Sequence, residues 1–156
     1  MHGDLVRRAF ELFRTDLQRL PSVTLRAGNA LDDYDEPPPY DPVVDEPNDA
    51  YLERYAFWGL NYLDAASWRH YLPRLIDYAL RHLRASRAAT QGLLSSLRPP
   101  DRVPPWLGSL TPEEEALIRD FLEVVAFGDD ANSERELAMQ ALEEWWLPNA
   151  LYRRDT

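Results

Sequence analysis

The chain has 156 residues, which suits one domain, and 45% of them are hydrophobic, which excludes a wholly disordered protein. It carries 27 acidic residues against 17 basic ones, for a formal net charge of −10. This excess disfavours nucleic-acid binding, because phosphate contacts need a basic face. No cysteine is present, which excludes disulfides, thiolate catalysis and cysteine-ligated zinc. The apolar runs are too short to span a membrane, and charges interrupt the N-terminus where a signal peptide would be apolar. We therefore expect a cytoplasmic protein.

The first predicted element is a helix over residues 4–20. Apolar residues recur with helical spacing from Leu5 through Phe13 to Leu20, and charged residues fill the positions between them. Asp4 provides a start signal and Pro21 a stop signal.

Residues 21–47 show no lasting period, and we expect a long acidic loop rich in proline. Residues 22–25 are a candidate extended piece, and Gly28 followed by Asn29 is a turn signal. The stretch 32–49, DDYDEPPPYDPVVDEPND, holds eight of the 27 acids and no basic residue. Its prolines favour polyproline II. A loop of this length is usually either functional or disordered, and the sequence leaves both readings open.

Two helices with polar start signals come next. Asn48 can cap the first, which has a broad apolar face, and Asp64 can cap the second. Pro73 falls inside the second pattern, so it either kinks one long helix or begins another. A short apolar run, GLLSSL, ends this region.

The C-terminal part begins with a proline-rich connector over residues 98–110. Thr111 and Glu114 then have the spacing of a capping box, with Pro112 at the first helical position, and this helix ends near Gly128. Ser133 and Glu136 repeat the spacing before a last helix. In that helix we expect Leu137, Ala141, Leu142, Trp145 and Trp146 to face inward and Glu143 and Glu144 to face water.

These elements predict an all-α fold. We expect a single compact domain over residues 1–156, with five to six helices and the acidic loop 21–47 after the first helix.

No motif in the sequence marks a catalytic or metal-binding residue. His2, His70 and His82 are the only histidines, and none lies in a metal-ligand pattern. The DDYDE stretch lacks the glycine of a calcium-binding loop, and phosphate-binding and nucleophile motifs are absent. We therefore expect no catalytic site, metal or cofactor, although a motif search alone leaves the question of an enzyme open.

Arginines and aromatic residues are each concentrated around residues 51–87. We interpret the arginines as a solvated helix face or as internal partners of the acidic segment, in preference to a phosphate-binding patch: Arg69, Arg74, Arg81, Arg84 and Arg87. Aromatic residues at helical spacing favour a core over a ligand pocket. Trp106, set among prolines, is either a plug on the core or an interface anchor.

Two stretches together resemble a family of small bacterial proteins of unknown function: WGLNYLDAASWRHYLPRLIDYAL, and SLTPEEEALIRDFLEVV followed by ALEEWW. YLP at 71–73 and LTPEE at 110–114 carry the resemblance, which implies a compact helical protein and supplies no catalytic residues. A looser similarity, of type only, is to bacterial toxin-neutralising immunity proteins, many of which are small, acidic and cysteine-poor.

The leading hypothesis is a non-enzymatic protein that neutralises a basic protein partner, as an immunity protein neutralises a nucleic-acid-directed toxin. Acids of the loop would imitate a polyanion and two tyrosines would be anchors: Asp32, Asp33, Tyr34, Asp35, Glu36, Tyr40, Asp41, Asp45 and Glu46. One alternative is an enzyme or ligand-binding domain with a pocket around His70, lined by Trp58, Trp68 and Tyr71. Another is a structural or regulatory subunit that pairs through Trp145 and Trp146. The oligomeric state stays open.

Overall fold

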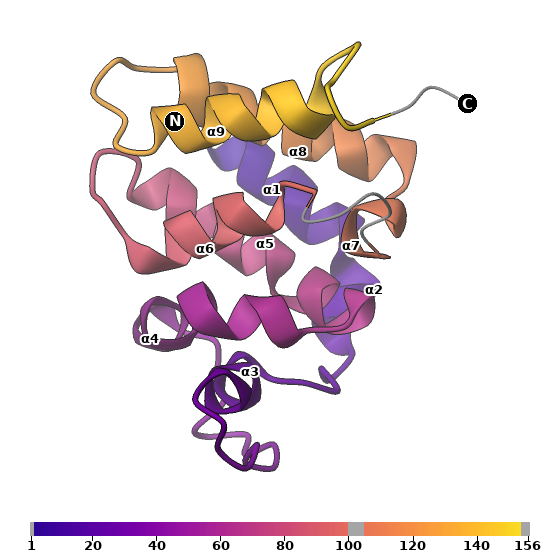
Figure 1. The fold of residues 1–156 in the computed structure, drawn as a ribbon, viewed down its shortest axis with the longest axis vertical. Coiled ribbons are helices and arrows are strands. Elements are labelled where there is room, and N and C mark those ends of the chain that lie inside the picture. The colour runs from indigo at the N-terminus through magenta and orange to yellow at the C-terminus, as the bar shows by residue number, and fades with distance from the viewer. Residues whose placement is uncertain (1, 100–104, 154–156) are drawn as a thin grey trace.

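The computed structural model describes residues 2–99 and 105–153, and within these residues the secondary structure is helical with no strand (Figure 1). The described residues form nine α-helices, one 3₁₀ turn (η1) and one π turn (η2). In chain order they are α1 Gly3–Leu12, α2 Arg14–Gln18, α3 Leu25–Asp32, α4 Asp49–Gly59, η1 Leu60–Tyr62, α5 Ala65–Arg81, α6 Ala88–Ser96, α7 Pro105–Gly108, α8 Pro112–Phe127, α9 Arg135–Ala141 and η2 Leu142–Trp146. The all-α class is confirmed, whereas the predicted five to six helices were too few.

The N-terminal third differs most from the prediction. The expected helix over residues 4–20 breaks at Phe13, whose side chain is buried, and continues as α2. The helix α3 was not predicted: Thr24 caps it, accepting a hydrogen bond from the Ala27 N–H at 2.9 Å. Gly28 therefore lies inside a helix and is not a turn residue. The loop predicted over 21–47 shortens to residues 33–48, which we call the acidic loop.

The capping signals of α4, α5 and α8 are confirmed. Asn48 and Asp64 each accept a hydrogen bond from the N–H three residues ahead, at 2.9 Å. Thr111 and Glu114 form the reciprocal capping box, with hydrogen bonds of 3.2 and 2.9 Å. Pro73 lies within the 17 residues of α5, so one helix spans the pattern that the sequence left divided.

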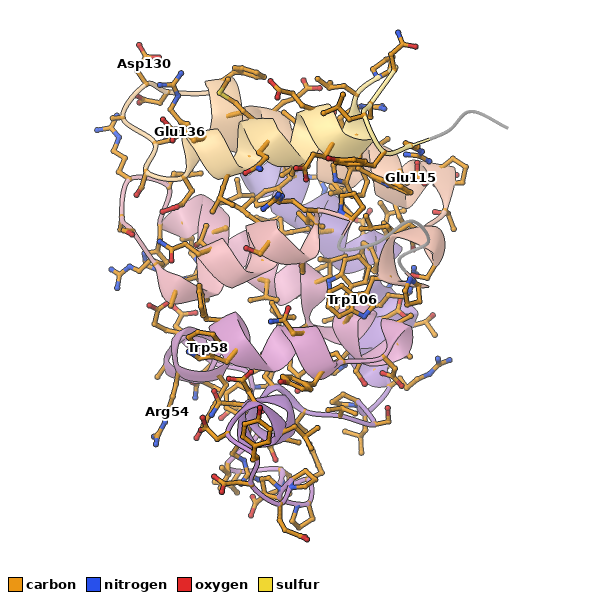
Figure 2. The ribbon with its side chains drawn as sticks, in the orientation of Figure 1. Arg54, Trp58, Trp106, Glu115, Asp130 and Glu136 are labelled. Carbon is orange, nitrogen blue, oxygen red and sulfur yellow. The ribbon has the colours of Figure 1, made fainter. Side chains whose placement is uncertain are left out.

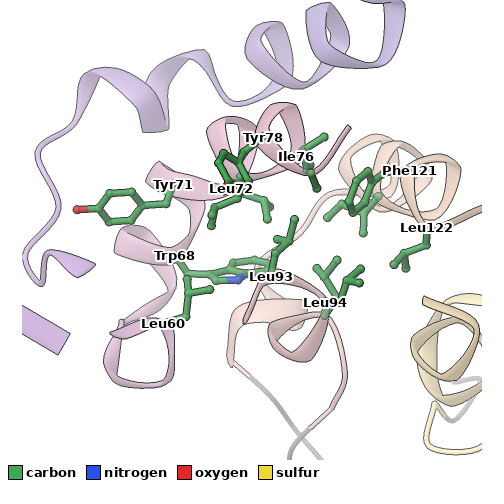
Figure 3. Close-up of a cluster of buried hydrophobic side chains, with 14 of the residues drawn as sticks. Leu60, Trp68, Tyr71, Leu72, Ile76, Tyr78, Leu93, Leu94, Phe121 and Leu122 are labelled. Carbon is green, nitrogen blue, oxygen red and sulfur yellow. The ribbon is translucent and has the colours of Figure 1, made fainter. Parts of the chain in front are cut away.

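The core lies between α5, α6 and α8 (Figure 3). Trp68 of α5 is fully buried, stacks on Trp106 of α7 at 5.9 Å between ring centroids, and donates its indole N–H to Ser96 at 3.1 Å. Trp106 donates to the Leu63 carbonyl at 2.7 Å. Trp106 is thus a plug on the core and not an exposed anchor. Residues 100–104 of the predicted connector lie outside the described residues.

Three glycines bring α3, α4 and α6 close together. A Cβ on Gly28 of α3 would lie 2.3 Å from the Gly59 carbonyl oxygen of α4, and one on Gly59 would lie 2.3 Å from the Leu25 carbonyl oxygen. On the other side of α4, a Cβ on Gly92 would lie 2.9 Å from the Phe57 Cα. Because only glycine permits backbones to approach this closely, these residues set where α3 lies on α4, and therefore where the acidic loop begins.

The last helix also departs from the prediction. Ser133 does not cap α9, which begins at Arg135 without a side-chain cap. The chain then widens into the π turn η2, in which the Leu147 N–H donates to the Leu142 carbonyl at 3.0 Å. This extra residue per turn carries Glu144 inward, where Arg98 holds it with hydrogen bonds of 2.8 and 2.9 Å. The prediction that Glu144 faces water was therefore wrong.

Candidate partner-binding loop

The acidic loop joins α3 to α4 at one end of the long axis of the molecule, with α8 and α9 at the other end (Figure 1). It contains no helix or strand. Its position leaves it open to a partner, and its conformation is held by the contacts described next.

The loop begins where α3 ends in a Schellman motif. The Asp35 N–H donates to the Ala30 carbonyl at 2.9 Å, and the Tyr34 N–H donates to the Leu31 carbonyl at 3.1 Å. This motif needs a left-handed residue at its turn, usually glycine. Here the position is filled by Tyr34, with φ of 60°, and its side chain is 98% exposed. The fold thus places a tyrosine in a strained backbone position and leaves its ring in solvent.

Asp45 anchors the middle of the loop. Its carboxylate accepts two hydrogen bonds from the Arg26 guanidinium, at 3.0 and 2.9 Å, and one from the Tyr51 hydroxyl at 2.8 Å. The backbone N–H of Arg26 in turn donates to the Tyr51 oxygen at 3.1 Å. Burial by itself raises the pKa of Asp45, but the hydrogen bonds from Arg26, Asp41 and Tyr51 outweigh it and hold the pKa below its usual range. Asp45 is therefore a charged, fully paired residue that ties the loop to α3 and α4.

Two further contacts brace the rest of the loop. Arg26 also donates to the Pro39 carbonyl at 3.1 Å, which fixes the proline run. Asp41 accepts hydrogen bonds from the N–H groups of Val43 and Val44 at 2.9 and 3.1 Å, and its own N–H donates to Asp45 at 2.8 Å. The sequence left open whether this segment is disordered, and the structure shows an ordered surface loop.

The predicted contact residues separate into three groups. Most are exposed on the acidic loop: Asp33, Tyr34, Asp35, Glu36, Tyr40, Asp41 and Glu46. Asp32, the last residue of α3, is partly buried and accepts a hydrogen bond from the Tyr62 hydroxyl at 2.9 Å. Asp45 departs from the prediction, because it is only 3% exposed and cannot meet a partner. The spacing of acids in the sequence gives no sign of which one turns inward.

In the part of the chain that the structure describes, the exposed acids of the loop have no cationic partner. Within residues 2–99 and 105–153, no ion pair forms at five loop carboxylates, which we call the exposed loop carboxylates: Asp33, Asp35, Glu36, Asp41 and Glu46. Apolar side chains stand among them, with Val43 82% exposed. The loop thus combines unpaired negative charge with apolar surface.

Helix α4 begins with an acid that is paired. Asp49 forms a two-point ion pair with Arg81 at 2.8 Å, and this hydrogen bonding holds the pKa of Asp49 below its usual value. Arg81 was expected either to be solvated or to pair with the acidic segment, and it pairs.

The other predicted arginines are used within the fold to different extents. Arg69 holds both Asp16 of α2 and Glu114 of α8 through two-point hydrogen bonds of 2.7 to 3.1 Å. Arg84 pairs with Asp129 at 2.6 Å on the surface. Neither arrangement presents a phosphate-binding surface.

The residues of the alternative pocket differ widely in burial. Trp68 and Tyr71 are buried in the core, whereas Trp58 is 53% exposed. His70 lies 2.9 Å from the Asp16 carbonyl oxygen, and burial lowers its pKa. The exposed Trp58 and the buried Trp68 and Tyr71 therefore do not line one common surface.

The pair proposed for self-association is largely internal. Trp146 is buried and donates to the Leu97 carbonyl at 2.8 Å. Trp145 is partly buried, and the Arg153 guanidinium lies over its ring at 5.1 Å. This leaves little of either ring for a second chain.

Within the described ranges no three His, Asp or Glu side chains gather as metal ligands would. In the same part of the chain, no helix has both the length and the apolar character needed to cross a membrane.

Comparison with known proteins gives one match. A family model described as "Family of unknown function (DUF6714)" matches residues 1–150, in agreement with the resemblance to an uncharacterised family. No curated protein matches the chain, and no solved structure matches it.

Proposed function

Since the chain belongs to the family of unknown function DUF6714, which assigns no activity, we propose a function from the structure: a non-enzymatic protein that binds and neutralises a basic protein partner through the acidic loop. In this proposal it acts in the bacterial cytoplasm as an immunity protein, and its partner is a nucleic-acid-directed toxin.

One observation carries the proposal: five exposed carboxylates that have no cationic partner among the described residues lie on a loop that is ordered in advance. An internal ion pair would have cancelled part of this charge, as it does for Asp45 and Asp49. Unpaired acids on one surface create a local negative potential, which attracts basic surfaces and accelerates association with them.

The mode of neutralisation follows from the chemistry of such a toxin. An enzyme that acts on nucleic acid holds phosphates with arginines and lysines. Carboxylates spaced along an extended loop can occupy those cations in place of phosphates. Because the contacts of Asp45 already order the loop, little conformational entropy is lost on binding.

The experiment compares two variants with the same change in net charge. The first replaces the exposed loop carboxylates: Asp33→Asn, Asp35→Asn, Glu36→Gln, Asp41→Asn and Glu46→Gln. The control replaces five exposed acids elsewhere: Glu11→Gln, Glu123→Gln, Asp130→Asn, Glu136→Gln and Glu143→Gln. The wild-type protein serves as bait to capture and identify a partner from the native host, and association rates are then measured for all three proteins at several salt concentrations.

We expect a basic partner, an association rate for the loop variant at least tenfold below that of the control at low salt, and a flatter dependence on salt. A partner that is acidic, or one that binds both variants equally, would show that the loop is not the binding surface.

A further inference from the structure

The arginines of this chain stack repeatedly on its own aromatic rings. Within residues 2–99 and 105–153, guanidinium carbons lie 5.0 to 5.9 Å from ring centroids at four places: Arg54 on Tyr55, Arg69 on Phe13, Arg81 on Tyr78 and Arg153 on Trp145. Among the described residues no arginine stacks in this way on Tyr34 or Tyr62. Both rings nevertheless meet solvent, at 98% and 42% exposure.

These two tyrosines flank the carboxylates at the end of α3. The Tyr62 hydroxyl donates to Oδ1 of Asp32 at 2.9 Å, which fixes the ring beside the carboxylate and leaves Oδ2 without a hydrogen bond from the described chain. Asp33 follows, exposed, and then Tyr34 at the left-handed turn. Because Tyr62 is hydrogen-bonded to Asp32 and Tyr34 lies two residues after Asp32 in the chain, both tyrosines stand at the end of α3.

We propose that Tyr34 and Tyr62, together with Asp32 and Asp33, form a docking face for arginine side chains of the basic partner. This inference rests on the proposed function. A guanidinium group is flat, so it can stack on a tyrosine ring while its N–H groups donate to an adjacent carboxylate. A lysine ammonium can make the ion pair but stacks less well. The face therefore selects arginine-bearing segments over lysine-bearing ones of equal charge.

The docking face does not extend from Tyr62 onto helix α4. Trp58, one turn before Tyr62, is also exposed, but Arg54 lies one turn further back, and Figure 2 shows both on the same edge of the molecule. The positive charge of Arg54 repels an incoming cation there. The docking face thus ends at Tyr62 and excludes Trp58.

The test uses the full chain and two peptide probes, one of alternating glycine and arginine and the other with lysine in place of arginine. Binding is measured by NMR titration at low salt. Because a cation–π contact at an exposed site contributes roughly 0.5–1 kcal/mol, we expect the arginine peptide to bind about two- to fivefold more tightly per occupied ring. The largest shifts should fall on Tyr34, Tyr62 and their neighbours.

Substitutions of the two tyrosines test the contribution of the rings while the charge of the docking face stays the same. Tyr34→Leu and Tyr62→Leu should each reduce the preference for arginine, whereas Tyr62→Phe, which keeps the ring, should retain most of it. Phe127→Leu is the control, since it removes an exposed aromatic ring from helix α8. Equal affinity for the two peptides, or an arginine preference unchanged in both leucine variants, would overturn the docking face.

The variant without the exposed loop carboxylates distinguishes the two proposals. If both peptides bind equally and lose affinity only in that variant, the docking face is wrong and the acidic loop remains the binding surface. If that variant and its five-acid control bind alike, the acidic loop fails as well.

Discussion

Tyr34 is in a backbone conformation that closes the Schellman motif of α3 but costs free energy for a residue other than glycine, and its ring packs on nothing within the described chain. A left-handed non-glycine residue costs roughly 1–2 kcal/mol, and the Tyr34 ring is almost wholly in solvent. A residue kept in such a position is explained more readily by what it contacts outside the chain than by stability.

Tyr34→Gly should therefore raise the free energy of unfolding, by up to about 1 kcal/mol, while it weakens binding of the arginine peptide. Chemical denaturation measures the first effect and NMR titration the second. Tyr40→Gly is the control, because Tyr40 has no positive φ and its replacement should not stabilise the protein. A destabilised Tyr34→Gly variant would contradict the assigned strain.

Asp45 differs from Tyr34, because its side chain is buried and its contacts are all within the chain. Asp45→Asn leaves Arg26 beside a neutral group and should lower the free energy of unfolding by about 3 kcal/mol, the usual cost of breaking a buried ion pair. The exposed Asp33→Asn is the matched control and should change stability by less than about 0.5 kcal/mol. Similar values for both would mean that Asp45 does not anchor the loop.

The ion pair between Asp45 and Arg26 also makes the free energy of unfolding depend on pH. The folded-state pKa of Asp45 is depressed, so the unfolded chain takes up the proton first as the pH falls. The stabilisation is complete above the unfolded pKa, about 3.9, and is lost as the pH falls through the folded value. The difference in unfolding free energy between wild type and Asp45→Asn should thus shrink below about pH 4; a difference that stays constant down to pH 2 would contradict the pairing.

At the scale of elements, the sequence predicted helix features that depend on neighbouring residues better than features that depend on residues far apart in the chain. The starts of α4, α5 and α8 were correct because a cap acts between residues three apart, as at Asn48, Asp64 and Thr111. Helix α3 was missed because Gly28 reads as a turn, and its actual role, close approach to Gly59, depends on a residue far along the chain. The inward turn of Glu144 likewise depends on Arg98 and on the π turn.

The same distinction holds for the candidate site. The sequence indicated which segment carries the charge, and seven of its nine proposed residues are exposed on the acidic loop. It could not indicate that Asp45 points inward, because its partner Arg26 belongs to the unpredicted α3. Tyr62 was missed for the same reason, since only the packing of η1 near the end of α3 brings it to Asp32.

Gly28→Ala tests how α3 is placed. The added methyl would lie 2.3 Å from a backbone oxygen that cannot move without displacing α4, so we expect a loss of at least about 2 kcal/mol in unfolding free energy. Gly108→Ala is the control, because nothing lies within 4 Å of its Cβ position. Thermal unfolding compares the two, and equal melting temperatures would rule out the close crossing.

Across the whole molecule, Arg69 connects parts distant in sequence. It joins α2, α5 and α8 through Asp16 and Glu114 and lies over the Phe13 ring at 5.0 Å. Burial lowers the pKa of Arg69, but the hydrogen bonds that Arg69 donates to both carboxylates outweigh it and raise the pKa overall. The guanidinium therefore stays charged.

Arg69→Met should leave two carboxylates without their shared cation and lower the free energy of unfolding by about 3–4 kcal/mol. Arg84→Met removes only a surface ion pair with Asp129 and should cost less than about 1 kcal/mol. Urea denaturation distinguishes them. If the two variants were equally stable, Arg69 would not be the link between these helices.

The anchoring of the acidic loop by Asp45 also bears on how this family can diversify. Apart from Asp41, the side chains that shape the loop are separate from those that face outward, so under the proposed function a change at Glu36 or Val43 can alter partner choice without unfolding the loop. Relatives with different partners should then share the Asp45, Arg26 and Tyr51 triad and differ mainly at the exposed positions. The loop would then keep one conformation across the family while its outward-facing residues vary.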